Sequence, residues 1–97
     1  MTYELDPHLW EKVEWGEANK IPVSPGCYAL INDLGEILYI GRSKILWNRL
    51  RNPRHHRGFS RRKDPSERVY IAWCCGWEVY EKEKELIRVW NPPLSIE

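Results

Sequence analysis

The sequence lacks an apolar run long enough to cross a membrane, and no signal-peptide pattern stands at its start. It also lacks internal repeats and low-complexity segments. Cysteine is scarce, and the three cysteines (Cys27, Cys74 and Cys75) show no Cys-x-x-Cys spacing typical of zinc sites. Because adjacent strand residues point to opposite faces, Cys74 and Cys75 are poorly placed to bridge each other. We therefore expect three free thiols, most of them buried, no membrane partner and a cytoplasmic protein.

The length of 97 residues predicts one domain with one small core. Six tryptophans and five tyrosines are many for this length, and some must fill that core. We expect an N-terminal helix and linker over residues 1–24 and the main body of the domain over residues 25–95.

The net charge of +1 hides a strong asymmetry along the chain. Residues 42–68 hold ten basic and two acidic side chains, whereas residues 1–41 hold two basic and seven acidic ones. Such a basic segment is often only a solvated loop, but a compact basic face attracts phosphates, and we favour nucleic-acid contact. The side chains expected to make this contact are Arg42, Lys44, Arg51, Arg54, Arg57, Arg61, Arg62 and Lys63.

The hydrophobic pattern predicts an α/β fold of the α+β sandwich type, with a small three-stranded antiparallel sheet flanked by helices in the order α-β-β-α-β-α. Asp6 and Pro7 are typical of a helix start, and Asp33 with Gly35 is typical of a hairpin turn. The expected helices are residues 6–16, 44–51 and 77–90, and the expected strands are residues 27–31, 37–40 and 68–74. The nearly continuous apolar run of the third strand indicates a central position in the sheet.

The last expected helix carries a carboxylate in the middle of its apolar face. At about 100° per residue, the apolar side chains of this helix lie within roughly 60° of Glu83, whereas its other glutamates lie opposite. A carboxylate placed there needs a partner. That partner is either Arg49 or Arg42 in a buried ion pair, or a metal ion. Mg²⁺ takes one or two carboxylates together with water and phosphate oxygens, and the basic segment leads us to favour the metal.

Two short strings, Gly26-Cys27-Tyr28 and Tyr39-Ile40-Gly41, each place a tyrosine close to a glycine in a predicted strand. Such a phenol either fills the core or, facing water and an arginine, acts as a general base or orients the water. Arg49 is either a surface arginine with a packed stem or a bidentate phosphate ligand. His55 and His56 are able to take a proton, but they fit equally well as phosphate contacts or ordinary loop residues.

At this point the chain resembles the GIY-YIG nucleases over about residues 25–95. The matching strings, in the family's order and near its spacing, are Gly26-Cys27-Tyr28, Tyr39-Ile40-Gly41-Arg42-Ser43, Asn48-Arg49-Leu50, and Glu83 with Leu86-Ile87 and then Pro92-Pro93. The resemblance implies a domain with a small three-stranded sheet flanked by helices. It also implies that this domain cleaves DNA with the help of one divalent ion, Mg²⁺ or Mn²⁺. The roles that it implies are site tyrosines for Tyr28 and Tyr39, a transition-state arginine for Arg49, a metal ligand for Glu83, and a basic site position for Arg42.

The chain departs from the family pattern at three positions. Cys27 replaces the usual Ile or Val, Pro53 stands where many members have His or Tyr, and Ser95 stands at the position of a late Asn. His55 and His56 follow Pro53 closely and are candidates for the missing accessory role. Ser95 is the corresponding candidate for the role of the late Asn.

The leading hypothesis is a metal-dependent endonuclease that hydrolyses DNA phosphodiester bonds. Water near a metal on Glu83 attacks the phosphate, Tyr28 or Tyr39 serves as base or orients the water, and Arg49 stabilises the developing charge. One alternative is a nucleic-acid-binding module whose catalytic site has decayed. Another is a protein-interaction domain with exposed tryptophans. Substrate specificity is expected from the basic segment over residues 51–68, from the first helix, or from a homodimer or larger partner.

Overall fold

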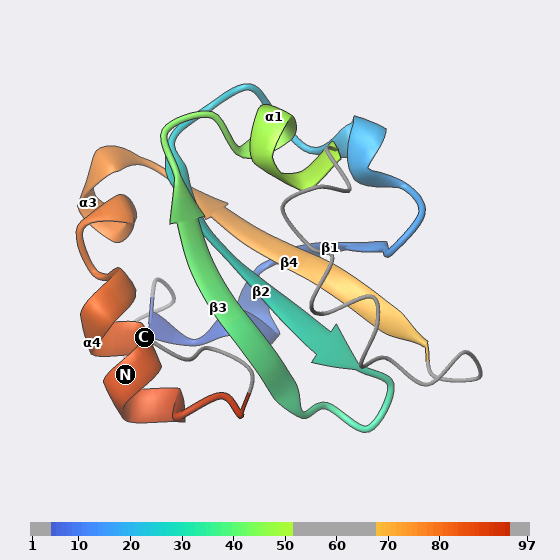
Figure 1. Cartoon of the computed structure of the whole chain (residues 1–97), viewed down its shortest axis with the longest axis vertical. Coiled ribbons are helices and arrows are strands. Elements are labelled where there is room, and N and C mark those ends of the chain that lie inside the picture. The colour runs from blue at the N-terminus through green and yellow to red at the C-terminus, as the bar shows by residue number, and fades with distance from the viewer. Residues whose placement is uncertain (1–4, 52–67, 94–97) are drawn as a thin grey trace.

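A four-stranded antiparallel sheet forms the centre of the protein in the computed structural model, which describes residues 5–51 and 68–93 (Figure 1). The strands are β1 (Glu11–Glu14), β2 (Gly26–Asn32), β3 (Ile37–Ser43) and β4 (Val69–Cys75). Their order across the sheet is β1-β4-β2-β3, so β4 and β2 are central and β3 is an edge strand. The hairpin of β2 and β3, and the central position of β4, agree with the sequence analysis.

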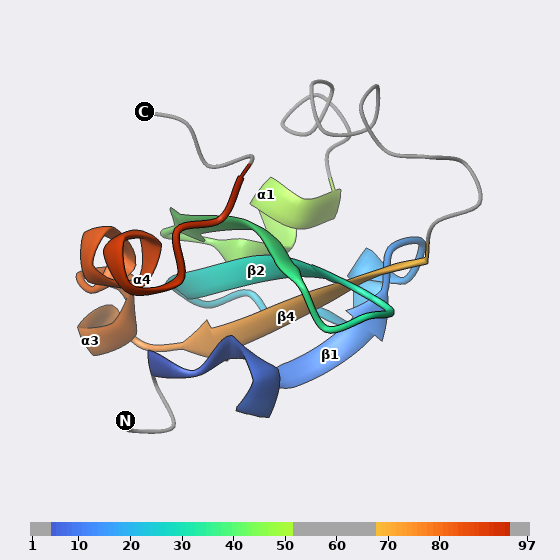
Figure 2. The ribbon, with the colours of Figure 1, turned by 90° about the horizontal axis from the view of Figure 1, so that it is seen from below.

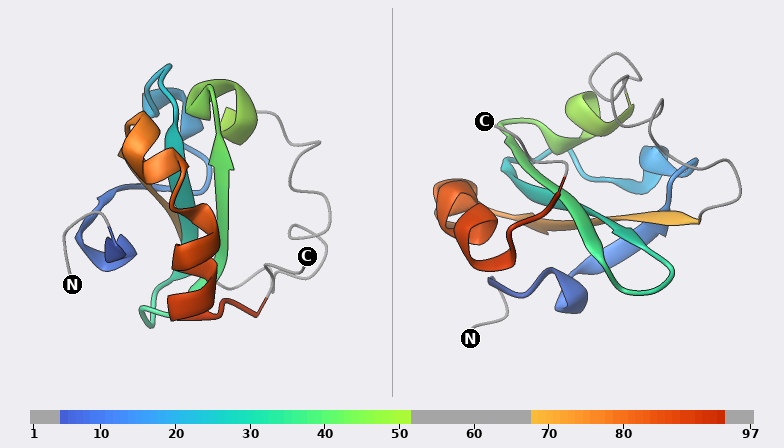
Figure 3. Two further views of the ribbon diagram at one scale, coloured as in Figure 1. Left: turned by 90° about the vertical axis from the view of Figure 1, so that its left-hand side faces the viewer. Right: turned by 60° about the horizontal axis from the view of Figure 1, so that its bottom comes forward.

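Short helices cover both faces of the sheet. The helical elements are the 3-10 turns η2 (Pro7–Leu9) and η3 (Ala18–Lys20) and the α-helices α1 (Leu46–Arg51), α3 (Trp77–Tyr80) and α4 (Glu83–Trp90). Figures 2 and 3 show α3 and α4 together beside the sheet, with α1 on the other side of β3. Within the described residues, none of these helices is long and apolar enough to cross a bilayer.

The core is divided into two layers by the sheet because successive strand residues point to opposite faces. Cys27, Ala29 and Ile31 of β2 join the layer that contains Val79 of α3 and Leu86 of α4. The alternate residues of β2 join the layer under α1, which contains Tyr28, Leu30, Leu46, Leu50 and Trp73 among others. Every residue of β2 is buried, as expected for a strand covered on both faces.

The prediction of three strands was wrong, because part of the expected first helix is the strand β1. Asp6 does cap a helical turn, with its side chain accepting a hydrogen bond from the His8 amide, but that turn ends at Leu9. The chain then extends, and residues 11–14 pair with residues 70–73 of β4. Pairing satisfies the backbone groups of β4 that would otherwise face solvent, and it outweighs the weak helical pattern of this segment.

The predicted order of elements was also wrong at the C-terminal end, where one expected helix is two. Helix α3 ends at Tyr80, and Lys82 adopts φ −94° and ψ 7°, outside the helical region, before α4 begins at Glu83. The entry to α3 is sharp because Gly76 has a φ of 124°, which favours glycine, and its amide donates to the carbonyl of Pro25 at 2.7 Å.

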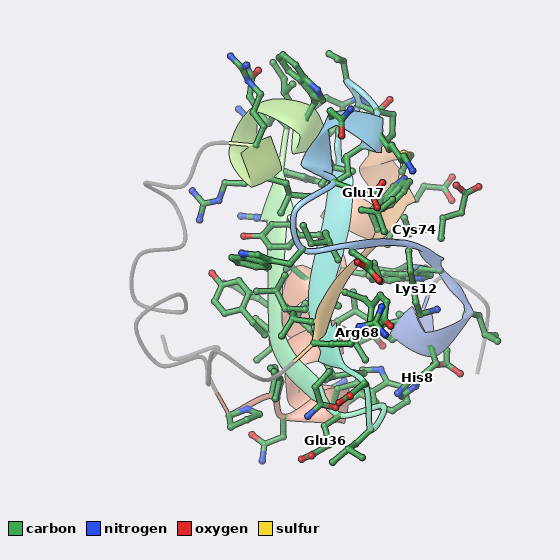
Figure 4. The ribbon with its side chains drawn as sticks, turned by 90° about the vertical axis from the view of Figure 1, so that its right-hand side faces the viewer. His8, Lys12, Glu17, Glu36, Arg68 and Cys74 are labelled. Carbon is green, nitrogen blue, oxygen red and sulfur yellow. The ribbon has the colours of Figure 1, made fainter. Side chains whose placement is uncertain are left out.

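The N-terminal segment is tied to both α4 and the β2–β3 turn. Nε2 of His8 lies 2.7 Å from the carbonyl oxygen of Gly35, and the His8 ring meets the ring of Trp90 edge-on at 5.3 Å. Figure 4 shows His8 at the end of the molecule where Glu36 lies. The indole nitrogen of Trp90 in turn donates to the carbonyl of Leu5 at 2.8 Å, and both residues pack against the core layer that contains Val79 and Leu86.

Candidate active site

The two tyrosines of the sequence strings meet on the α1 face of the sheet. Tyr28 of β2 is fully buried and lies opposite Gly41 in the strand register, while Tyr39 of β3 is half-buried. Their rings stack with centroids 5.9 Å apart and planes at 25°. A Cβ at Gly41 would lie only 2.6 Å from the Tyr28 hydroxyl oxygen, so the glycine of this string leaves room for the phenol of the other.

Arg49 of α1 joins this pair of phenols. Its Nε donates a hydrogen bond to the Tyr28 hydroxyl at 3.3 Å. Burial lowers the pKa of the Arg49 guanidinium, but its hydrogen bonds and proximity to Tyr28 and Tyr39 outweigh this and raise it overall. Burial, followed by the neighbouring Tyr39, raises the pKa of Tyr28 well above its usual value despite the nearby Arg49. Tyr28 is therefore a protonated phenol at neutral pH, and Arg49 is a fixed cation beside it.

Glu83 and Arg42 lie on the other face of the same edge strand. Glu83 is the first residue of α4, and its side chain is 18% exposed. Its Oε1 lies 3.5 Å from Nε of Arg42, which is the β3 residue directly after Gly41. The expected position of Glu83 on the core-facing side is confirmed, since Val79 and Leu86 before and after it are buried. Of the two arginines considered as its partner, Arg42 makes the ion pair.

The donor set at Glu83 fits a magnesium ion better than a structural metal. Among the described residues, no group of three or more His, Cys, Asp or Glu side chains could enclose an ion. Mg²⁺ commonly needs one or two protein carboxylates because water and phosphate oxygens fill its other positions, whereas zinc needs several His or Cys ligands. The nearby thiol of Cys27 is unsuitable: burial, and then the charge of Glu83, raise its pKa to about 12.

Tyr80 is a neighbour of this group that the sequence analysis did not single out. The Arg42 guanidinium lies over the Tyr80 ring, 4.6 Å from its centroid, in a cation–π contact. On the same side, the thiol of Cys27 donates to the carbonyl of Val79 at 2.9 Å. The signal for Tyr80 was its place one helical turn before Glu83 in the sequence.

Several predicted site residues lie outside the described part of the chain. These are Arg54, His55, His56, Arg57, Arg61, Arg62, Lys63 and Ser95, whose predicted roles stay predictions. Of the other basic candidates, Lys44 is exposed, and the Arg51 guanidinium lies 4.0 Å above the ring of Trp47. The described part of the basic segment therefore presents cations beside α1 at the β3 edge.

A shallow hollow of about 380 Å³ lies at the opposite edge of the sheet. Its lining residues are Lys12, Val13, Glu14, Glu17, Lys20 and Tyr70. Figure 4 shows Lys12, Glu17 and Arg68 on this side of the molecule. Its lysines already have partners within the chain, because Lys20 pairs with Glu17 at 2.5 Å and Lys12 donates to the carbonyl of His8 at 2.6 Å. Glu14 likewise pairs with Arg68, so the hollow offers little charge for a ligand.

Comparison with known proteins shows which family this chain belongs to. A sequence model of the GIY-YIG catalytic domain matches residues 24–94, which include the four candidate residues Tyr28, Tyr39, Arg49 and Glu83. The chain belongs to the GIY-YIG family. Its curated relatives include UvrABC system protein C of Clostridium novyi, which is 35% identical over 82 residues, and that of Clostridium botulinum, which is 40% identical over 91 residues. These matches cover 78% and 82% of this chain but only 13% and 14% of the relatives, so the chain spans a small part of their length.

Solved structures give the same result for the fold. The GIY-YIG N-terminal endonuclease domain of UvrC from Thermotoga maritima, bound to magnesium as its catalytic divalent cation, is 32% identical with a TM-score of 0.55. That match covers 77% of this chain and 86% of the domain. A point mutant of the same domain, also bound to its catalytic cation, matches with the same identity and TM-score. The predicted endonuclease-domain class is therefore confirmed.

Proposed function

We propose that this chain is a metal-dependent endonuclease domain that hydrolyses phosphodiester bonds in DNA. The observation that carries the proposal is the arrangement around β3, with Tyr28, Tyr39 and Arg49 on one face and Arg42 and Glu83 on the other. Tyr39 and Arg42 are three residues apart, which is about 10 Å along a strand. A phosphate at the exposed edge of β3 would therefore lie within reach of both groups.

Arg49 is the residue proposed to stabilise the developing charge on the phosphate. Its guanidinium is charged at any accessible pH, and the hydrogen bond to Tyr28 holds its orientation before substrate arrives. A fixed cation of this kind stabilises a transition state without reorganising during the reaction. Tyr28 is accordingly a positioning residue, because its buried hydroxyl has no access to solvent.

Tyr39 is proposed as the phenol that contacts the attacking water. It is half-buried, whereas Tyr28 is fully buried, so only the Tyr39 side chain has an exposed part. A hydroxyl that donates to the phosphate and accepts from the water would align the two for attack. His55 and His56 remain proposed acceptors for the proton that the water loses.

Glu83 is proposed as the carboxylate that holds one Mg²⁺ or Mn²⁺ ion. The bound ion would supply Lewis-acid stabilisation of the phosphate oxygens. Arg42 balances the charge of Glu83 in the protein alone and, being partly exposed, is free to turn toward a phosphate when the ion binds. Arg42, Lys44, Arg51 and the basic residues that follow are proposed as contacts to the DNA backbone.

The test is cleavage of labelled single-stranded, duplex and branched DNA with Mg²⁺, with Mn²⁺ and with EDTA. We expect metal-dependent cleavage by the wild type and a loss of at least about 100-fold in Glu83→Gln. Glu85→Gln is the matched control, because Glu85 lies on the same helix but is exposed and outside the site. Both variants should keep the melting temperature of the wild type within a few degrees.

Two outcomes would contradict the proposal. Cleavage by Glu83→Gln at the wild-type rate would show that this carboxylate does not hold the essential ion. Salt-dependent DNA binding without cleavage under any metal condition would instead favour the alternative of a binding module with a decayed site.

A further inference from the structure

An exposed tryptophan leads by direct contacts to the candidate metal ligand. Trp77 of α3 is 55% exposed, and its ring meets the ring of Tyr80 edge-on with centroids 5.2 Å apart. Tyr80 in turn lies under the guanidinium of Arg42, which pairs with Glu83. We call Trp77, Tyr80 and Arg42 the α3 ledge.

The exposure of Trp77 is not explained by core packing. Trp10 and Trp73 are 2% and 8% exposed and belong to the two core layers, whereas Trp77 belongs to neither. Its backbone is nevertheless held firmly, because the Gly76 amide donates to Pro25 and the Tyr80 amide donates to Gly76. The indole is therefore a large planar surface on a fixed turn, which reduces the entropy lost when a ligand stacks on it.

We infer that the α3 ledge stacks an unpaired nucleobase next to the cleaved phosphate, so that the preferred DNA substrate has a single-stranded segment at the site. This inference rests on the proposed nuclease function. A flat aromatic surface beside a cation is the combination that binds single strands, with bases on the rings and phosphates on the basic groups. Bases inside a duplex are already stacked and cannot reach such a surface.

The position of the ledge fits a base close to the cleaved bond. The Trp77 ring contacts the Tyr80 ring, which lies 4.6 Å from the Arg42 guanidinium, and Nε of Arg42 lies 3.5 Å from the Glu83 carboxylate. At about 3.4 Å per stacked nucleotide, these successive contacts place the indole within a few nucleotides of the carboxylate. Arg42 also places one cation beside the aromatic rings of the ledge, where it can contact a phosphate next to a stacked base.

Binding of uncleaved DNA tests the inference without requiring catalysis. In a Glu83→Gln background, we compare Trp77→Ala with the parent on three ligands of equal phosphate number: a single strand, the same strand built from abasic nucleotides, and a duplex. We expect Trp77→Ala to weaken single-strand binding by about 5- to 150-fold and to leave the abasic strand and the duplex within twofold. Trp77→Phe should recover most of the lost affinity.

Val89→Ala is the matched control, since Val89 is 46% exposed on the neighbouring helix α4 and is not one of the three residues of the ledge. An equal loss on all three ligands, or no loss on the single strand, would overturn the inference. In the second case the ledge would be a surface for a protein partner. Because these measurements compare binding to intact DNA and not cleavage rates, they stand whether or not wild-type protein cleaves DNA.

Discussion

Replacing Gly41 by alanine tests whether the two sequence strings form one site. The new Cβ would lie 2.6 Å from the Tyr28 hydroxyl oxygen and 2.7 and 2.9 Å from the ring atoms Cζ and Cε1. The Tyr28 ring is fully buried and stacked on Tyr39, so it has little room to move aside. Overpacking of this kind costs about 1–3 kcal/mol of unfolding free energy.

The expected change in melting temperature follows from that cost. For a domain of this size, each kcal/mol lowers the melting temperature by about 4–8 °C. The Tyr28 hydroxyl also holds Arg49 through the 3.3 Å hydrogen bond, so a displaced ring moves the guanidinium. A misplacement of about 1 Å in a catalytic group can reduce the rate by about 100-fold. We therefore expect a folded but much slower enzyme, measured by initial cleavage rates below its melting temperature.

Two other glycines serve as controls for Gly41→Ala. No atom lies within 4 Å of a Cβ placed on Gly16, so Gly16→Ala should keep wild-type stability and rate. A Cβ on Gly26 would lie 2.1 Å from the backbone carbonyl oxygen of Cys74, which cannot yield, so Gly26→Ala should be the least stable of the three. A Gly41→Ala protein with wild-type melting temperature and rate would refute the reasoning.

Two further predictions concern charge around the site. Because burial, followed by the charge of Glu83, raises the pKa of Cys27 to about 12, the folded state holds this proton more tightly than the unfolded state does. The stability that the buried thiol contributes is therefore complete below about pH 9 and is lost as the pH rises toward 12. Between these pH values, the unfolding free energy of Cys27→Val, measured in urea titrations, should fall less steeply than that of the wild type, by about 1.4 kcal/mol per pH unit. Plots of unfolding free energy against pH that run parallel for the two proteins would contradict this prediction. Arg42→Gln removes the guanidinium that lies 3.5 Å from the Glu83 carboxylate and competes with a divalent cation for it. The affinity for the divalent cation, measured by calorimetry without DNA, should therefore rise about two- to fivefold. An unchanged affinity would mean that the ion does not use this carboxylate.

The central strands could be predicted from the sequence because local signals and tertiary structure agree there. The apolar run from Val69 to Cys74 is buried almost throughout in β4. The turn between β2 and β3 forms where it was expected, and Gly35 has a φ of 86°, which favours glycine. The side chain that holds the turn is that of Asn32 and not the expected Asp33, since Asn32 accepts from the amides of Leu34 and Glu36 at 3.0 and 2.9 Å. These strands need no information from distant parts of the chain to be recognised.

Strand β1 and the break between α3 and α4 could not be predicted in the same way. Three of the four β1 residues are exposed charges, and the strand exists because β4, more than 50 residues later, offers a free edge. The helix break occurs at Glu81 and Lys82 without a glycine or proline to mark it. Both features depend on tertiary contacts that a local pattern does not contain.

For the candidate site, the sequence suggested candidate residues but not how they are arranged. Glu83 was singled out because a carboxylate interrupts an apolar stripe, and its largely buried position agrees with that prediction. The sequence left Arg49 and Arg42 as equal candidates to pair with it. The alternation of β3 resolves the choice, because it directs Arg42 to the α4 face while Arg49 lies over Tyr28 on the other face.

The pairing of β1 with β4 bears on where a working domain can be cut. The family match begins at residue 24, but the sheet is completed by residues 11–14, which lie before that boundary. A protein trimmed to the matched segment would expose the backbone amides and carbonyls of residues 70–73 as an open template for strands of other molecules. In this protein, the sheet that protects the edge of β4 therefore extends beyond the segment that carries the family's sequence pattern.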